Sequence, residues 1–168
     1  SIAQIAKLEN KPALEIVEAI ERNGGASVVS FSMDPEDIRF VMSLPWVATA
    51  SDGRAYLPGA DKPHPRSYGT FPRKISRFAQ QEEIISVGHA IRSATGLPAE
   101  ILGLQDRGTL KPNMIADIVV YDPTTLQDKA TFDDPHQYCV GIEYVFIGGE
   151  FAVYRGRPTG ALHGQALK

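Results

Sequence analysis

An uncharged run of β-forming and small residues, 46–50, lies between Pro45 and the tripeptide Ser51-Asp52-Gly53. A short apolar run bounded by Pro and Gly is typical of a fully buried strand, and its lack of charge favours a parallel sheet covered by helices. The carboxyl end of such a strand is where α/β barrels and doubly wound sheets place their chemistry. Asp52 is therefore a candidate metal ligand or general base, and Gly53 leaves room beside the carboxylate. The alternative is that Asp52 only caps the next turn.

The residues before this run predict two helices, a strand and a third helix. Asp34 is a good N-cap because Pro35 can occupy the first helical position and acids follow in the first turn. The β-forming residues 26–31 predict the strand. Because the links are short, this strand and residues 46–50 should be parallel partners in a βαβ unit. The apolar stripes place the helices at residues 2–8, 12–21 and 34–44.

Beyond Gly53 the periodic pattern stops. Residues 54–67 carry three prolines and a glycine among charges, which predicts a long irregular loop. Loops of this length are usually functional lids or disordered, and the position directly after Asp52 favours a lid. Thr70 is a plausible cap for the helix that follows. The later helices are expected at residues 70–79, 82–95 and 98–103.

The C-terminal part of the chain has the composition of a β structure. Residues 118–121 predict a strand, and residues 142–147 and 150–154 flank Gly148-Gly149, the signal of a two-residue hairpin. The change of composition falls near residues 104–112. We therefore expect an α/β chain with two domain parts, residues 1–104 and 105–168.

The overall composition excludes several classes of protein. A net charge of −3 gives no electrostatic reason to expect nucleic acid or an anionic membrane as a partner. The single cysteine, Cys139, excludes an intrachain disulfide, and no apolar stretch approaches the ~20 residues that cross a bilayer. The N-terminus lacks both Met and a signal-peptide pattern. We expect a cytoplasmic protein and a piece of a longer polypeptide.

The histidines do not form a zinc motif by spacing. His89 is expected to be structural within its helix, and His136 and His163 to be solvated. His64 differs, because His64-Pro65-Arg66 lies in the expected lid, where a stiffening proline presents an imidazole and a guanidinium. Arg66 could grip a substrate carboxylate in bidentate fashion; the alternative is a lid held by its own salt bridges.

Two further nucleophile candidates, Ser51 and Cys139, have no supporting pattern. Ser51 lacks the Gly-x-Ser-x-Gly surroundings of a nucleophile elbow, and Cys139 lies just before the hairpin. Both are expected to be structural.

Several stretches together resemble the C-terminal part of the N-acyl-D-amino-acid deacylases, or D-aminoacylases, of the metal-dependent amidohydrolase superfamily. The segment 108–123 resembles the superfamily widely, whereas the His-Pro-Arg to Phe-Pro-Arg run and the Asp-x-Ala-Thr-Phe segment resemble this branch specifically. The resembling stretches are 51–53, 64–73, 95–104, 106–123 and 128–132.

This resemblance implies the last units of a (β/α)₈ barrel in residues 1–104 and the C-terminal strands of a small β-sandwich in residues 105–168. Asp52 would match the aspartate at the end of the last barrel strand, which binds or faces zinc, takes a proton from water and passes it to the leaving amine. His64 and Arg66 would be substrate-binding lid residues. The other zinc ligands of this family lie upstream of the part that the chain resembles.

The leading hypothesis is thus a zinc-dependent hydrolase of the amide bond of N-acyl-D-amino acids, present as a C-terminal portion that is inactive alone. Its partners would be the small-molecule substrate and the rest of the same polypeptide. Another amidohydrolase, hydantoinase-like or a deacetylase, or a non-catalytic structural module are the alternatives. A partial barrel would expose strand edges, so we also expect self-association.

Overall fold

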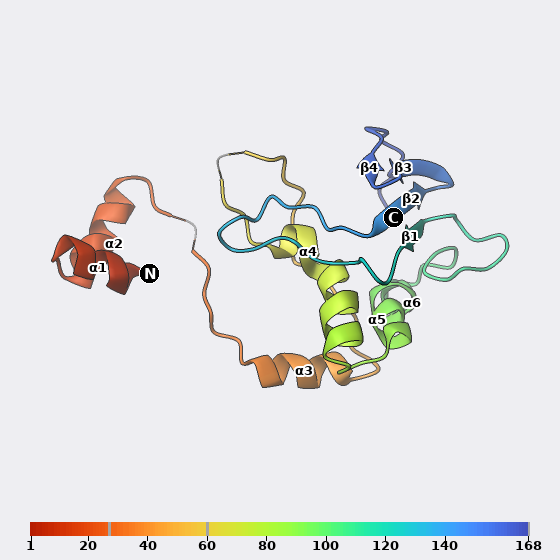
Figure 1. Ribbon diagram of the computed structural model, residues 1–168, viewed down its shortest axis with the longest axis horizontal. Helices are drawn as coiled ribbons and strands as arrows, with labels where there is room; N and C mark the ends of the chain where they lie inside the picture. Colours follow the sequence, from red (N-terminus) through yellow and green to blue (C-terminus); the bar gives the residue numbers. More distant parts are fainter. Residues whose placement is uncertain (27, 60, 168) are drawn as a thin grey trace. The chain divides into compact units, whose positions relative to one another are not determined.

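The computed structural model describes residues 1–26, 28–59 and 61–167, which form two compact units, Ser1–Ser32 and Met33–Lys168 (Figure 1). The first unit contains α1 (Ile2–Glu9) and α2 (Ala13–Arg22), as the apolar stripes predict. Ser1 caps α1, since its hydroxyl accepts a hydrogen bond from the backbone N–H of Gln4 at 3.3 Å. Asn10 ends α1 in a left-handed conformation with φ 52°.

The second unit begins with α3 (Pro35–Ser43), and the predicted start of this helix is confirmed. The Asp34 carboxylate accepts a hydrogen bond from the backbone N–H of Glu36 at 2.8 Å. Met42 of α3 packs against a small core of Ala79, Ile85 and Ala90, which lie in and beside the next two helices of this unit. Few apolar side chains are buried there, so this core is thin for a unit of its length.

The next helix has two parts, α4 (Arg66–Arg73) and the π-helix η1 (Lys74–Gln81). Pro72 lies inside α4, and because proline has no N–H the regular hydrogen-bond ladder is interrupted just where the wider π-helix begins. Thr70 was expected to cap a helix, and this expectation is wrong. The helix starts four residues earlier, and the Thr70 hydroxyl donates to the carbonyl of Arg66 at 2.9 Å.

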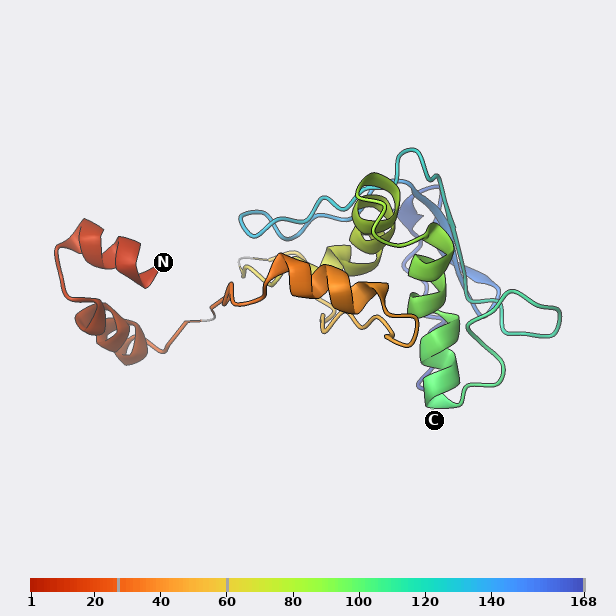
Figure 2. The same ribbon diagram turned by 90° about the horizontal axis from the view of Figure 1, so that it is seen from below.

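Two short helices follow, α5 (Val87–Ala94) and α6 (Gly96–Leu102). The helix expected at residues 82–95 starts late because Glu83 is left-handed, with φ 52°, and because Ser86 caps α5 by accepting from the backbone N–H of His89. Glu82 is held instead by the guanidinium groups of Arg39 and Arg77, at 3.1 and 2.6 Å. Figure 2 shows α5 and α6 following one another end to end.

The C-terminal segment forms an antiparallel sheet in the order β1-β2-β3-β4. The predicted hairpin is confirmed, since Gly148 and Gly149 have φ of 60° and 89°, as the primed turn between two strands requires. The short last strand is not evident in the sequence pattern. The strands are β1 (Ile118–Tyr121), β2 (Ile142–Ile147), β3 (Glu150–Tyr154) and β4 (Arg157–Pro158).

The prediction of two strands that form a βαβ unit is wrong for the described residues. Residues 47–50 belong to no strand, and neither do the described residues of 26–31; Ser27 lies outside the described part. An extended segment becomes a strand only when a neighbouring strand pairs with it, and no such neighbour lies beside residues 47–50 among the described ranges. Residues 47–50 are tied to the helices instead: the backbone N–H of Thr49 donates to the carbonyl of Ser93 in α5 at 2.7 Å, and the ammonium of Lys74 in η1 donates to the Thr49 hydroxyl.

The fold is thus a mixed α/β arrangement in which helices precede a sheet, and the change from helix to strand falls between Leu102 and Ile118. The assignment of residues 1–104 and 105–168 to two domains of a larger protein stays a prediction. Within residues 1–26, 28–59 and 61–167, no helix combines the length and the apolar character that a membrane crossing needs.

Candidate active site

Asp52 lies in a turn rather than at the tip of a strand. Its φ is 47°, a left-handed conformation that aspartate tolerates better than most residues. Its carboxylate is 83% exposed and accepts from the guanidinium Nη2 of Arg66 at 2.8 Å. In this chain the backbone at Asp52 is therefore not the extended strand tip that the sequence predicts, and the carboxylate faces solvent instead of a pocket whose other walls would belong to residues outside the chain.

Gly53 explains why this turn sits against α4. A Cβ on residue 53 would lie 2.9 Å from the Cα of Ser67, which is closer than side chains come to a backbone. The hydroxyl of Ser67 accepts from the backbone N–H of Arg54 at 3.3 Å, and the hydroxyl of Ser51 accepts from that of Gly53 at 3.1 Å. Ser51 thus shapes the turn, in agreement with its expected structural role. The close approach fixes Asp52 beside the first turn of α4.

His64 and Arg66 meet Asp52 at this point, so the structure brings all three predicted site residues together. The ring nitrogen Nδ1 of His64 accepts from the backbone N–H of Arg66 at 3.0 Å, which leaves Nε2 as the protonated nitrogen of the neutral ring. The edge of the His64 ring packs against Phe132 with ring centres 5.0 Å apart. Arg66 is the first residue of α4, whereas His64 closes the irregular loop.

The electrostatics of the cluster favour a neutral imidazole. Burial lowers the pKa of His64, and the nearby guanidinium groups of Arg66 and Arg73 lower this pKa further, whereas the Asp52 carboxylate acts to raise it. The Asp52–Arg66 ion pair is exposed to water, and such pairs contribute only ~0–1 kcal/mol to stability. The guanidinium is consequently free to exchange partners or to bind a second carboxylate with its remaining N–H groups.

The residues that the structure describes do not make a metal centre by themselves. Among the described residues, no group of three or more His, Cys, Asp or Glu side chains is placed to hold a metal ion. A catalytic zinc takes about three protein ligands, whereas Asp52 is a single carboxylate that pairs with Arg66. This chain could therefore contribute at most one ligand at Asp52 to a metal site completed by other residues.

The remaining nucleophile and histidine candidates lie outside the cluster. Cys139 is half-buried, and burial raises the pKa of its thiol, so it is a poor nucleophile, as expected. His89 lies in α5, where its Nε2 is buried and has no hydrogen-bond partner in the described part of the chain. His163 lies in the exposed tail.

His136 differs from its expected solvated role. Its ring bridges two elements, with Nδ1 2.8 Å from the hydroxyl of Tyr68 and Nε2 3.0 Å from the carbonyl of Asp61. Sequence reasoning also missed Asp128, whose carboxylate is 8% exposed and accepts from Nε of Arg73 at 3.0 Å. For Asp128 the sequence signal was its place in a stretch that resembles the deacylases, and His136 has no such signal. The contacts of both join residues more than 50 positions apart in the sequence, so local patterns do not predict them.

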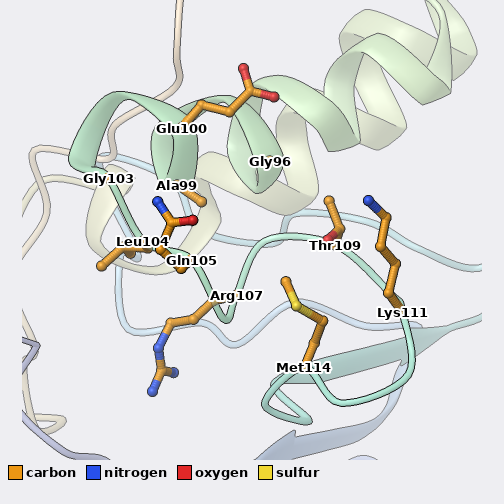
Figure 3. A pocket seen from close by; sticks show the side chains of 10 residues that line it. All are labelled: Gly96, Ala99, Glu100, Gly103, Leu104, Gln105, Arg107, Thr109, Lys111 and Met114. Atoms are coloured by element: carbon orange, nitrogen blue, oxygen red, sulfur yellow. The ribbon is translucent and has the colours of Figure 1, made fainter.

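A pocket of the described chain lies away from this cluster. It has a volume of about 370 Å³ and lies between α6 and the loop that follows it (Figure 3). The side chains of Arg107, Lys111 and Met114 line it from the loop, and Glu100 lines it from α6. None of Asp52, His64 and Arg66 lines this pocket, so we do not assign the chemistry of the chain to it.

A carboxylate, a guanidinium and a neutral imidazole gathered after a short apolar run are consistent with a hydrolytic enzyme. The chain matches the Amidohydrolase family over residues 1–153, and it belongs to that family. It is 34% identical over 164 residues to N-acyl-D-glutamate deacylase of Alcaligenes xylosoxydans xylosoxydans, an alignment that covers 98% of this chain and 33% of the relative.

Solved structures show the same relationship. A crystal structure of D-aminoacylase matches 95% of this chain and 32% of its own length, with a TM-score of 0.83 and 32% identity. The N-acyl-D-glutamate deacylase of Bordetella bronchiseptica, in complex with zinc and a phosphonate inhibitor, matches 94% of this chain and 33% of its own, with a TM-score of 0.79 and 32% identity. The chain spans about a third of the length of these proteins.

Proposed function

We propose that this chain is part of a zinc-dependent amidohydrolase that cleaves the amide bond of N-acyl-D-amino acids. One observation carries the proposal: Asp52, His64 and Arg66 converge in a chain that takes the D-aminoacylase fold over 95% of its length. The similarity to deacylases of N-acyl-D-amino acids supports this activity over that of a hydantoinase-like enzyme, a deacetylase or a non-catalytic module.

In this proposal Asp52 is the base. Its exposed carboxylate can take a proton from the hydrolytic water and return it to the leaving amine. Asp52 is also the one metal ligand that we assign to this chain, and the other zinc ligands would come from residues outside it. Because the described residues cannot assemble the metal site, this chain should bind zinc weakly by itself.

Arg66 is proposed to bind the carboxylate of the substrate. One N–H of its guanidinium holds Asp52, and the planar group keeps further donors for a second carboxylate. His64 would lie beside that carboxylate as a neutral donor through Nε2, because its Nδ1 is already occupied by the backbone N–H of Arg66. This arrangement would place the acid group of an N-acyl amino acid next to the base.

The proposed architecture follows from the same relationship. Residues 1–104 would be the last units of a (β/α)₈ barrel, and residues 105–168 the C-terminal share of a small β-sandwich domain. In this arrangement residues 46–50 would become a strand when a neighbouring strand pairs with them, and Asp52 would then face the centre of the barrel.

The isolated chain provides the first test. With zinc supplied, the 168-residue chain should hydrolyse N-acetyl-D-glutamate, N-acetyl-D-aspartate and N-acetyl-D-leucine no faster than buffer, and equilibrium dialysis should find less than one tightly bound zinc per chain. The physical reason is that one carboxylate cannot hold a catalytic zinc. Clear turnover by the chain alone would show that its own residues complete an active site, which contradicts the proposal.

A further inference from the structure

The loop that carries His64 is held by a distant segment of the chain. We name the described residues 54–59 and 61–65 the site loop, and residues 128–138, between β1 and β2, the clasp segment. Figures 1 and 2 both show the blue-green segment between β1 and β2 reaching away from the sheet to lie beside the yellow loop. The alternative that the sequence left open was a lid held by its own salt bridges; besides the ion pair Arg66–Asp52, contacts from the clasp segment hold this loop.

Three contacts join the clasp segment to the site loop. The ammonium of Lys62 donates to the carbonyl of Asp133 at 2.9 Å. The His136 ring lies 3.0 Å from the carbonyl of Asp61 and 3.3 Å from its carboxylate, and Phe132 packs on the ring of His64. The clasp segment is itself closed at its base, where Gln127 and Val140 exchange backbone hydrogen bonds of 3.2 and 3.0 Å.

A fourth contact ties both segments to α4. The hydroxyl of Tyr68 lies 3.1 Å from the carbonyl of Tyr56, in the site loop, and 2.8 Å from Nδ1 of His136, in the clasp segment. Tyr68 comes two residues after Arg66 in the same helix, so these contacts fix the site loop with respect to the helix that presents the guanidinium. Burial raises the pKa of the Tyr68 phenol, which therefore keeps its proton.

Counting hydrogens shows that this network depends on the charge of His136. Nε2 faces two acceptors of Asp61, so it carries a hydrogen in either state. In the neutral ring Nδ1 must accept the one hydrogen of the Tyr68 hydroxyl, and the carbonyl of Tyr56 then receives none from it. In the imidazolium form Nδ1 donates to the Tyr68 oxygen, which frees the hydroxyl hydrogen for Tyr56, and every contact is satisfied.

The titratable and charged groups near the His136 ring come from the site loop, from α4 and from the clasp segment itself. The carboxylate of Asp61 faces the ring from the site loop, and the neutral Tyr68 faces it from α4. Tyr138, from the clasp segment itself, packs its ring on Tyr68 with centres 5.6 Å apart, and Lys62 directs its charge to Asp133. The side chain of His136 is only 13% exposed, so these partners rather than water satisfy it.

We propose that the clasp segment positions His64 and Arg66 for substrate, through the bridge Tyr68–His136–Asp61, and that protonation of His136 completes the bridge. His136 and Tyr68 are thus positioning residues that act on the site through the loop. The importance of this positioning for catalysis rests on the proposed function, whereas the bridge itself is read from the geometry of the described chain.

The test compares two variants of the full chain that make the same change in one aromatic cluster. Tyr68→Phe removes the bridging hydroxyl, and the control Tyr138→Phe removes a hydroxyl that takes part in no hydrogen bond described for Tyr138. Hydrogen exchange should show the amides of Arg54 and Arg66, which donate to Ser67 and His64 at the two ends of the site loop, at least fivefold less protected in Tyr68→Phe than in Tyr138→Phe. The amide of Val145 in the hairpin should be equally protected in both, which shows that the fold is intact.

Two readouts go beyond stability. In the unaltered chain, protection factors of the site loop should rise as the pH falls through the titration of the His136 ring, and in Tyr68→Phe this rise should disappear. NMR titration of the His64 ring should give a higher pKa in Tyr68→Phe than in Tyr138→Phe, because a loosened loop uncovers the ring from Phe132. Equal behaviour of the two variants, or protection that falls with falling pH, would overturn the proposal.

If Tyr68→Phe also lowers the protection of the Val145 amide, the fold itself is disturbed, and the variant His136→Gln then provides the test. Glutamine can donate to Asp61 but cannot be protonated, so the loop of a folded His136→Gln chain should show no pH-dependent protection; an unchanged pH dependence would overturn the proposal. None of these readouts requires activity. If the clasp segment behaves as expected but the enzyme has no deacylase activity, only the proposed function is contradicted. If the enzyme is an active deacylase but the clasp segment does not hold the site loop, only this inference is contradicted.

Discussion

Gly69 lies inside α4, where the carboxylate of Asp128 leaves no room for a side chain. A Cβ on residue 69 would overlap the carboxylate atoms of Asp128. Asp128 cannot easily move away, because it accepts from Arg73 at 3.0 Å and from the backbone N–H of Ala130 at 2.9 Å. This contact explains the glycine in a helix, where glycine is otherwise unfavourable, and it anchors the base of the clasp segment to α4.

Gly69→Ala should therefore destabilise the chain by about 1–3 kcal/mol in urea unfolding, because the inserted methyl group forces the Arg73–Asp128 pair apart. The matched control is Gly88→Ala in α5, where the nearest atom to a new Cβ is the hydroxyl oxygen of Ser86 at 3.9 Å. That change should be neutral or stabilise by up to ~1 kcal/mol through helix propensity. A Gly69→Ala chain as stable as Gly88→Ala would show that Asp128 does not pack as described.

At the scale of elements, the sequence predicted what local interactions decide. The cap at Asp34, the turn at Gly148-Gly149 and the apolar stripes of α1 and α2 depend on residues within a few positions of one another. The helix expected at residues 82–95 was misplaced at its start because Glu83 is left-handed and its neighbour Glu82 pairs with a residue as distant as Arg39.

The predictions that failed at the scale of elements depend on contacts between residues far apart in the sequence. Residues 46–50 have the composition of a buried strand, but a strand is defined by its neighbour, and composition does not supply one. Asp52 was found because it follows that run, and its partners His64 and Arg66 because they follow in the next loop. His136 and Asp128 were missed because they reach the site from the far side of the sequence, between two strands of the sheet.

At the scale of the whole molecule, the chain exposes more surface than its size requires. Its accessible surface is 12184 Å², whereas two separate folded units of these lengths would expose roughly 9,400 Å² together. Obligate interfaces bury ~2,000–5,000 Å² over both partners, or roughly 1,000–2,500 Å² on each, so the excess on this one chain is at least as large as one side of such an interface. Large apolar side chains contribute to it, among them Trp46, which is 68% exposed, and Phe40, which is 66% exposed.

We therefore expect the isolated chain to self-associate, because exposed apolar surface is covered when copies meet. Sedimentation velocity at rising concentration should show species larger than a monomer, and Trp46→Lys should weaken this association. The control is Leu162→Lys, which changes an apolar side chain that is 96% exposed in the tail. A monodisperse monomer at all concentrations would contradict the expectation.

The central claim is that Asp52 supplies the base of an N-acyl-D-amino-acid deacylase whose remaining metal ligands lie outside this chain. The most direct measurement uses a chimera in which this chain replaces the matched third of the Alcaligenes N-acyl-D-glutamate deacylase. With zinc, the chimera should hydrolyse N-acetyl-D-glutamate, and Asp52→Asn should lower its kcat at least ~100-fold. Asp34→Asn, which removes a carboxylate but keeps the cap of α3, should stay within about twofold of the parent chimera. A folded chimera without activity, or one that Asp52→Asn leaves as active as Asp34→Asn does, would contradict the account.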